Sequence, residues 1–437
     1  MRQRGVTRSS PVLAALRAPI TTQAAFALVL LAAGLAIVWF RIRSFDQVTA
    51  LYGYSPTALI DPTWLLPQFA SDFPNGEAEM LKSLAGQIWR WLGGWLPHRA
   101  LVPVLIFAEF CTLAAGAYLC ARTVNPERPA WTATVAALLL TTGSLVSCDL
   151  ARWFHPYYGS AYNFAYGFGF AALAAILRRK PVWAGLCLGI TAAFHPIIAL
   201  FFGMTVAVVA LLDLAGFRLA RLLLGGAVSL AIAAAWAFAM FSGAGVSGET
   251  VDPQIFIALS RLMSSHWFPI TIGIFSDRAF ETTLPFAGFM VVLATLLRPF
   301  TPLAGRVDFR IGAAILLLLV VTAVGLLASE YSGVPFLVKL ALHRASSIAL
   351  LIGAIIVVPR MAADVIFGSF IRAALAAAIL LLAFWHNNGP PILLCTLYAA
   401  VVLFEERSLR PRSELILATT AIALALAFVA KLTNTPA

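Results

Sequence analysis

The chain has 437 residues, of which 61% are hydrophobic and only 11% are charged. A water-facing surface needs roughly a quarter of its residues charged, so this composition excludes an ordinary soluble protein and indicates a membrane protein. The net charge of +11 would point to nucleic acid in a soluble chain, but here it fits the Lys and Arg excess of cytoplasmic membrane loops, and we expect no nucleic-acid partner.

Apolar windows close to the roughly 20 residues that cross a bilayer recur along the chain. They predict an all-α, polytopic transmembrane helical protein, built as a single integral membrane domain over residues 1–437. We expect about thirteen spans, at residues 23–40, 100–120, 131–148, 162–177, 182–194, 196–212, 222–241, 283–297, 311–329, 337–358, 373–386, 391–404 and 415–430.

The charges in the connections give these spans an orientation. With the N-terminus inside, 19 of the 30 Lys and Arg residues fall in inner connections, whereas 11 of the 19 carboxylates fall in outer ones. Basic residues concentrate on the cytoplasmic side of membrane proteins. We therefore expect the N-terminus inside and the polar outer connections on the opposite face, where a site can be built.

The first outer loop, residues 41–99, is the longest connection. Its second half, 77–96, has apolar residues at helical spacing and Trp residues that suit the membrane–water interface, which predicts an amphipathic helix on the outer surface. Asp61 and Asp72 precede it in a Pro-rich stretch, which we expect this helix to press against the membrane domain. Partial desolvation suits either carboxylate for a general base, and the alternative is that both are turn formers.

The segment 149–166 reads DLARWFHPYYGSAYNFAY and forms a short outer connection that enters the next span. Its aromatic rings, with His155, Arg152 and Asn163, could line a sugar-binding surface. An aromatic belt at the membrane interface explains the same residues equally well.

Residues 182–212 are nearly unbroken apolar sequence, which permits one long helix or two short ones bent at His195-Pro196. Proline removes a backbone donor and disfavours helical geometry in the preceding residue. A single helix would also reverse the orientation of every later span, and 14 basic residues would then lie inside against 16 outside. We therefore predict a break, which puts His195 at the outer end of two spans.

Further cations lie in later outer connections. The second large outer loop, residues 242–282, contains SRLMSSHWFP with Arg261 and His266. Lys339, His343 and Arg344 follow in FLVKLALHR, where the four-residue spacing of Lys339 and His343 predicts one helix face. Cations at membrane depth usually pair, and the phosphate of a lipid carrier is a suitable partner. Snorkelling to the interface is the alternative.

Glu109 is the one acidic residue inside a predicted span. An intramembrane carboxylate is a functional hypothesis by default. The simpler explanations are that Glu109 is protonated or that it is paired with a neighbouring span.

The overall layout, together with AGLCLGITAAFHPIIAL at 184–200, Asp61-Pro62 followed by Asp72, SRLMSSHWFP and LHR, resembles a known family. It is similar to the GT-C superfamily of polyprenyl-phosphate-sugar-dependent glycosyltransferases, and more narrowly to a group of bacterial GT-C-like membrane proteins. The similarity of plan covers most of the chain, although each motif is short.

The resemblance implies a glycosyltransferase that moves a sugar from a polyprenyl-phosphate carrier to an acceptor at the periplasmic face of the bacterial inner membrane. Asp72 or Asp61 would take the acceptor proton. Members of the superfamily often carry paired first-loop acids that act as base or metal ligand. This chain has no adjacent pair at either position, so a divalent metal stays open and no metal ligand is assigned. The implied substrate-binding residues are Arg344, His343, Lys339, Arg261, His266, His195 and His155.

Two other classes compete with this interpretation. The broken pair at His195 and the intramembrane Glu109 suit a secondary transporter of a small solute or lipid-linked substrate. Against it, the sequence shows no convincing internal repeat, and polar residues concentrate at the outer face. The third class is a non-catalytic assembly or lipid-binding protein.

Overall fold

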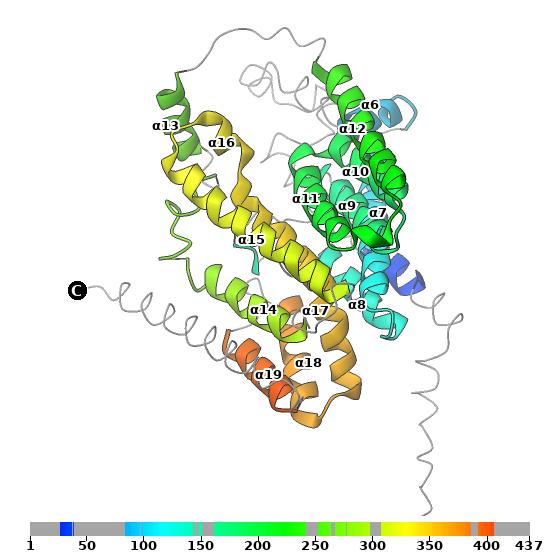
Figure 1. Ribbon diagram of the computed structural model, residues 1–437, viewed down its shortest axis with the longest axis vertical. Helices are drawn as coiled ribbons and strands as arrows, with labels where there is room; N and C mark the ends of the chain where they lie inside the picture. The colour runs from blue at the N-terminus through cyan, green and yellow to red at the C-terminus, as the bar shows by residue number, and fades with distance from the viewer. Residues whose placement is uncertain are drawn as a thin grey trace, which may run out of the picture.

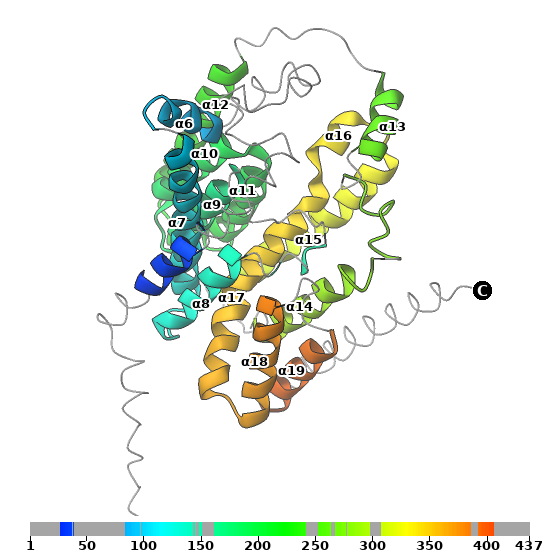
Figure 2. The same ribbon diagram turned by 180° about the vertical axis from the view of Figure 1, so that it is seen from behind.

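The structure is a computed structural model, and every element that it describes is helical (Figures 1 and 2). The described residues are 27–36, 38, 84–96, 98–142, 145, 148–150, 161–241, 252–263, 267–276, 278–297, 307–385 and 392–405. After a short helix at Ala27–Ala36, the elements are α6 (Leu84–Gly93), α7 (His98–Val124), α8 (Ala130–Thr142), α9 (Ala161–Leu177), α10 (Pro181–Phe194), α11 (Pro196–Leu211), η3 (Leu214–Gly216), α12 (Leu219–Phe241), α13 (Pro253–Met263), α14 (Thr283–Leu296), α15 (Val307–Tyr331), α16 (Pro335–Leu340), η5 (Leu342–Arg344), α17 (Ala345–Phe367), α18 (Phe370–Trp385) and α19 (Ile392–Glu405).

Four of these helical segments are long and apolar enough to cross a membrane: Pro103–Val124, Leu219–Ala239, Val307–Tyr331 and Pro335–Phe367. The other apolar helices in the described part of the chain have 10–17 residues. The expectation of an all-α chain built from apolar helices is therefore confirmed. The number of spans and their orientation stay predictions.

Helix α17 is the centre of the bundle. Its residues from Ala345 to Asp364 are all buried, since it packs against α7, α8 and α11 on one side and against α14 and α18 on the other. In Figure 1 the helices α7–α12 accordingly lie together on one side of α17, and α14, α18 and α19 lie on the other. Small residues bring two pairs of helices into backbone contact: Gly116 of α7 meets Gly167 of α9, and Gly185 of α10 meets Gly225 of α12.

The predicted break between two short helices is confirmed. Helix α10 ends at Phe194, α11 begins at Pro196, and His195 between them has an extended backbone (φ −157°, ψ 105°). Within the predicted surface segment a helix is confirmed over Leu84–Gly93, where Leu84, Ile88 and Leu92 pack on the core, and its position on the outer membrane surface stays a prediction. Residues 77–83 lie outside the described part of the chain.

One prediction about helix geometry is wrong. Helix α16 ends at Leu340, Ala341 takes a left-handed conformation (φ 46°), and a 3-10 turn over Leu342–Arg344 precedes α17. Lys339 and His343 are thus separated by a break in the helix and do not share one regular helix face.

Polar contacts gather at the two ends of α15, which has 25 residues and is about 37 Å long. We call these the Asp308 end and the Glu330 end. At the Asp308 end, Arg360 of α17 binds Asp308 and also Asn125 from the α7–α8 connection. The connections that the charge count assigns to the inside therefore meet there.

Candidate functional site at the Glu330 end

The break at His195 supplies the first side chain of the site. The Nδ1 atom of His195 accepts a hydrogen bond from the backbone N–H of Ile198 (3.3 Å), so the imidazole caps the start of α11. Its ring also lies against the ring of Tyr162 in α9, with 4.8 Å between ring centroids. Because Pro196 cannot continue the hydrogen-bond ladder of α10, the local sequence itself directs His195 out of the helix and toward α9.

The 3-10 turn η5 supplies two more residues. Arg344 is buried, with 7% of its surface exposed, and His343 is buried with 1% exposed. The Nδ1 atom of His343 lies 3.2 Å from the Ser329 hydroxyl of α15. The turn can approach α15 so closely because Gly325 has no side chain: a Cβ there would lie 2.2 Å from the backbone nitrogen of His343.

A buried carboxylate stands next to this turn. The Ser347 hydroxyl donates to both carboxylate oxygens of Asp149, at 2.9 and 2.8 Å, and both residues are fully buried. Ser347 follows Arg344 by three residues, which is about one helical turn. Asp149 and Tyr166 accordingly act electrostatically on Arg344. The contact brings the connection before α9 against the start of α17.

Arg344 is thus the centre of a mixed cluster, which we call the Arg344 cluster. It consists of Arg344 with the groups close enough to act on its charge: Asp149, which is bound to Ser347 one helical turn away, Tyr162 and Tyr166 of α9, and His195, which lies against Tyr162. One guanidinium, one carboxylate, two phenols and one imidazole meet where α9, α11 and α17 come together. This combination can hold an anion beside aromatic surface, because the cation attracts charge and the rings provide apolar faces.

Glu109 is paired across two helices, as one of the two simpler explanations predicted. It is fully buried in α7, and the side-chain amide of Asn163 in α9 donates to its carboxylate at 2.9 Å. Asn163 directly follows Tyr162 of the Arg344 cluster. Glu109 therefore supports the helix that carries the phenols.

Two of the predicted cations make their contacts elsewhere. Arg261 of α13 donates to the backbone carbonyl of Glu330 (2.8 Å) and lies over the ring of Phe268. Lys339 lies over the ring of Phe256, 4.7 Å from its centroid. These contacts tie α13 to the end of α15 and to α16, and none of them joins Arg261 or Lys339 to the Arg344 cluster.

Of the predicted site residues, the structure therefore places Arg344 and His195 in one cluster and His343 beside it. Asp61, Asp72, His155 and His266 lie outside the described residues. Sequence reasoning did not select Asp149, Tyr162 or Tyr166 as individual site residues. The available signal was the density of aromatic and polar residues in 149–166, which did not reveal that Asp149 meets Ser347.

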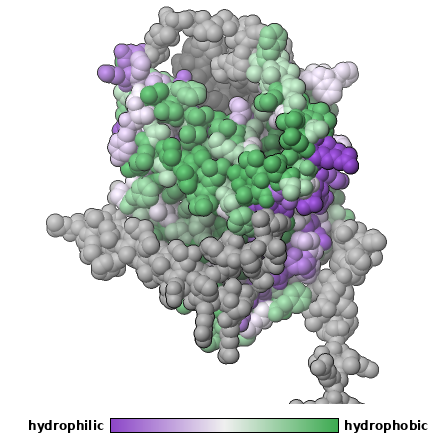
Figure 3. All heavy atoms as spheres, in the orientation of Figure 1, coloured by the Kyte–Doolittle hydropathy of each residue, from purple (hydrophilic) through white to green (hydrophobic). Residues whose placement is uncertain are grey.

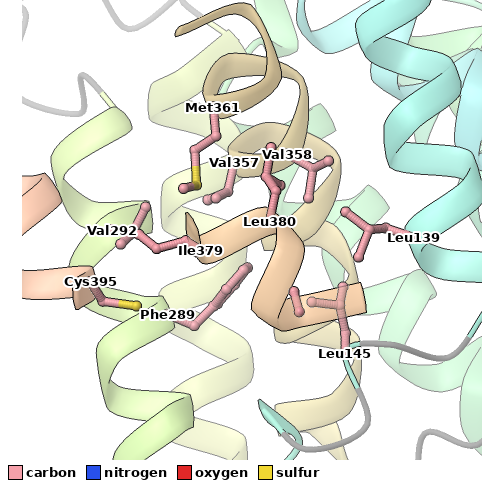
Figure 4. Close-up of a pocket in the computed structure, with 11 residues that line it drawn as sticks. Leu139, Leu145, Phe289, Val292, Val357, Val358, Met361, Ile379, Leu380 and Cys395 are labelled. Carbon is pink, nitrogen blue, oxygen red and sulfur yellow. The ribbon is translucent and has the colours of Figure 1, made fainter. Parts of the chain in front are cut away.

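One cavity lies elsewhere in the described part of the chain, and its lining is entirely apolar. It has a volume of about 20 Å³ and lies between α8, α14, α17, α18 and α19. Figure 4 shows Leu139, Phe289, Val292, Met361 and Cys395 among the side chains around it. A space of this size holds at most one water, and a water needs polar partners, so this is a packing defect and no substrate site.

Within the described ranges, no group of three or more His, Cys, Asp or Glu residues is arranged to hold a metal ion. No protein-family model, curated protein or solved structure matches the chain.

Proposed function

We propose that this protein is a GT-C-like membrane glycosyltransferase, which moves a sugar from a polyprenyl-phosphate carrier to an acceptor. The observation that supports the proposal is the Arg344 cluster. A buried guanidinium is costly unless an anion balances it. Asp149 supplies one negative charge. The phosphate of a lipid carrier is a second anion that a guanidinium can bind, through two parallel charge-assisted hydrogen bonds.

In the proposed reaction the acceptor hydroxyl attacks the anomeric carbon, the bond from that carbon to the phosphate oxygen breaks, and the lipid phosphate leaves. Negative charge grows on the phosphate in this step, so Arg344 would stabilise the transition state. Tyr162, which is half-buried, offers an aromatic surface for the sugar. We assign the acceptor proton to Asp72, or to Asp61, on the sequence argument alone.

The proposal includes a membrane orientation. The charge count puts the Asp308 end inside, so the Glu330 end and the Arg344 cluster would face the periplasm of a bacterial inner membrane. A polytopic chain with about thirteen spans would present the cluster to the outer leaflet, from which a lipid-linked donor enters sideways. The grouping of alternate connections at the two ends of α15 supports this arrangement.

The test is sugar transfer from a polyprenyl-phosphate donor by the purified protein in lipid. We expect Arg344→Gln and Asp72→Asn each to lower the rate by about 100-fold or more. Arg278→Gln, which removes an exposed cation from the 267–282 segment that packs near Glu330, should leave the rate unchanged. Folding of each variant is checked by its elution volume and thermal unfolding. Undiminished transfer by both site variants would refute the assignment.

A secondary transporter is the second candidate, because the helix break at His195 lies beside the Arg344 cluster and discontinuous helices form the binding sites of many transporters. It predicts solute uptake into proteoliposomes that Glu109→Gln abolishes, because the variant removes the buried charge next to the break. Sugar transfer without uptake would exclude this candidate, and uptake without transfer would exclude the transferase.

A further inference from the structure

A basic corner lies at the Asp308 end, far along the bundle from the Arg344 cluster. We define the basic corner as Arg178, Arg179 and Lys180 from the α9–α10 connection, with Arg218 from the connection that precedes α12 and Arg221 from the first turn of α12. All five are exposed. The two connections are neighbours because Gly225 of α12 packs directly against the backbone of Pro181 at the start of α10.

The backbone of the corner is held in place by its own contacts. Arg179 has a positive φ of 58°, and its guanidinium binds both carboxylate oxygens of Asp213 at 3.2 and 3.3 Å. It also lies directly on Gly216, where a Cβ would come within 2.8 Å of it. Arg178 donates to the Thr123 hydroxyl at the end of α7. The cations are therefore displayed on a defined surface.

The corner has far more positive than negative charge. Its carboxylate, Asp213, is shared between Arg179 and the buried Arg310, which binds it at 2.8 Å. Lys180, Arg218 and Arg221 make no ion pair with any residue that the structure describes. Three exposed cations on one small surface repel one another, and an anion bound between them would relieve that repulsion.

An apolar helix surface begins where the corner ends. Along α12, Leu219, Leu223 and Leu230 are exposed by 62–71%, and Gly226 between them leaves open space, with nothing within 4 Å of the position of a Cβ. Residues 219, 223, 226 and 230 recur at helical spacing and share one face. Figure 3 shows hydrophobic residues across this side of the molecule, with hydrophilic residues at their border.

We infer that the basic corner and the exposed face of α12 together bind an anionic phospholipid. The lipid phosphate lies between Lys180, Arg218 and Arg221, and an acyl chain runs along α12 over Gly226. The apolar face adjoining the cations selects a lipid over free phosphate or nucleic acid, since neither of those has a part that covers Leu223 and Leu230. The inference does not depend on the proposed reaction, which takes place at the other end of the bundle.

The experiment compares purified protein in micelles supplemented with phosphatidylglycerol or with phosphatidylcholine. Bound lipid is counted by native mass spectrometry, and thermal unfolding is followed in parallel. Each cation near an anionic lipid contributes roughly 5-fold in affinity, so the triple variant Lys180→Gln/Arg218→Gln/Arg221→Gln should bind phosphatidylglycerol on the order of 100-fold more weakly. In the triple variant, phosphatidylglycerol should also no longer raise the thermal unfolding temperature.

Three matched controls make the result decisive. The charge-preserving variant Lys180→Arg/Arg218→Lys/Arg221→Lys and the distant neutralisation Arg278→Gln should both bind the lipid as the unaltered chain does. Gly226→Leu, which fills the gap on α12 without changing charge, should weaken lipid binding several-fold. If the triple variant does not fold, Arg221→Gln alone should still bind roughly 5-fold more weakly.

The inference is overturned if the triple variant, or Arg221→Gln in its place, retains phosphatidylglycerol at the original level. It is also overturned if phosphatidylcholine binds equally well, or if inorganic phosphate at millimolar concentration reproduces the whole stabilisation. Unchanged binding by Gly226→Leu would overturn the placement of the acyl chain.

Discussion

Replacing Arg360 should destabilise the protein more than any surface change, because this one side chain joins four parts of the bundle. Its guanidinium binds both carboxylate oxygens of Asp308 at 2.7 and 3.0 Å. It also donates to the Asn125 amide oxygen at 2.9 Å and to the backbone carbonyl of Leu296. The Arg360 side chain is 10% exposed and that of Asp308 is 16% exposed, so water replaces little of what is lost.

Arg360→Met keeps most of the volume of the side chain and removes every donor. It leaves a mostly buried carboxylate, an amide oxygen and a carbonyl without their charged partner. Breaking a buried ion pair by removing one side costs about 3–5 kcal/mol, and we expect the lower part of this range because Asp308 retains some access to water.

The free energy of unfolding is measured by reversible unfolding in mixed micelles, or by steric trapping in lipid. The double variant Arg360→Met/Asp308→Leu is the informative control, since removing both charges takes away the unpaired carboxylate. It should recover at least half of the free energy of unfolding that the single variant loses. A double-mutant cycle then gives the interaction free energy between Arg360 and Asp308. A loss below about 1 kcal/mol in the single variant would refute the reasoning, because the pair would then be solvated or rearranged.

Further predictions concern the Glu330 end and α12. Gly325→Ala should lower the free energy of unfolding by about 3 kcal/mol, because its Cβ would lie 2.2 Å from the backbone nitrogen of His343 and η5 would have to move. Unfolding measurements on the variant test this. Gly226→Ala, where nothing lies within 4 Å of a Cβ, should leave the free energy of unfolding unchanged or raise it by up to about 1 kcal/mol in the same assay, because Ala has a higher helix propensity than Gly. A loss equal to that of Gly325→Ala would refute the argument that contact with η5 decides the effect. Glu330→Leu should cost about 2 kcal/mol, since its carboxylate accepts from both the backbone N–H (2.9 Å) and the hydroxyl (2.8 Å) of Thr271. Hydrogen exchange of the Thr271 amide should become faster in that variant and not in Gly226→Ala.

Local features of the chain were read correctly from sequence where the signal is itself local. The break at His195 follows from a property of Pro196, whose ring removes a donor whatever surrounds it. The amphipathic helix α6 follows from the spacing of Leu84, Ile88 and Leu92, which depends only on helical geometry. Such features need no knowledge of the partner surface.

The shared face expected for Lys339 and His343 failed for the opposite reason. No Gly, Pro or Asn marks the helix break at Ala341, and an alanine has no local preference for a left-handed backbone. The turn is imposed by packing, because α15 presents Gly325 to the chain at Leu342 and His343. Only the neighbouring helix explains the conformation.

The sequence by itself determined that the chain is built from apolar helices, that one apolar stretch is interrupted at His195, and that its charges alternate between connections. Each of these properties depends only on residues that are close together in the sequence, because hydropathy and proline geometry act at short range. The tertiary structure alone decided which polar groups meet: Asp149 binds Ser347 from 198 residues away, and Arg360 binds Asn125 from 235 residues away. Nothing in the local pattern selects such partners, because each carboxylate or amide is satisfied by whichever donor the packing of the helices brings within 3 Å.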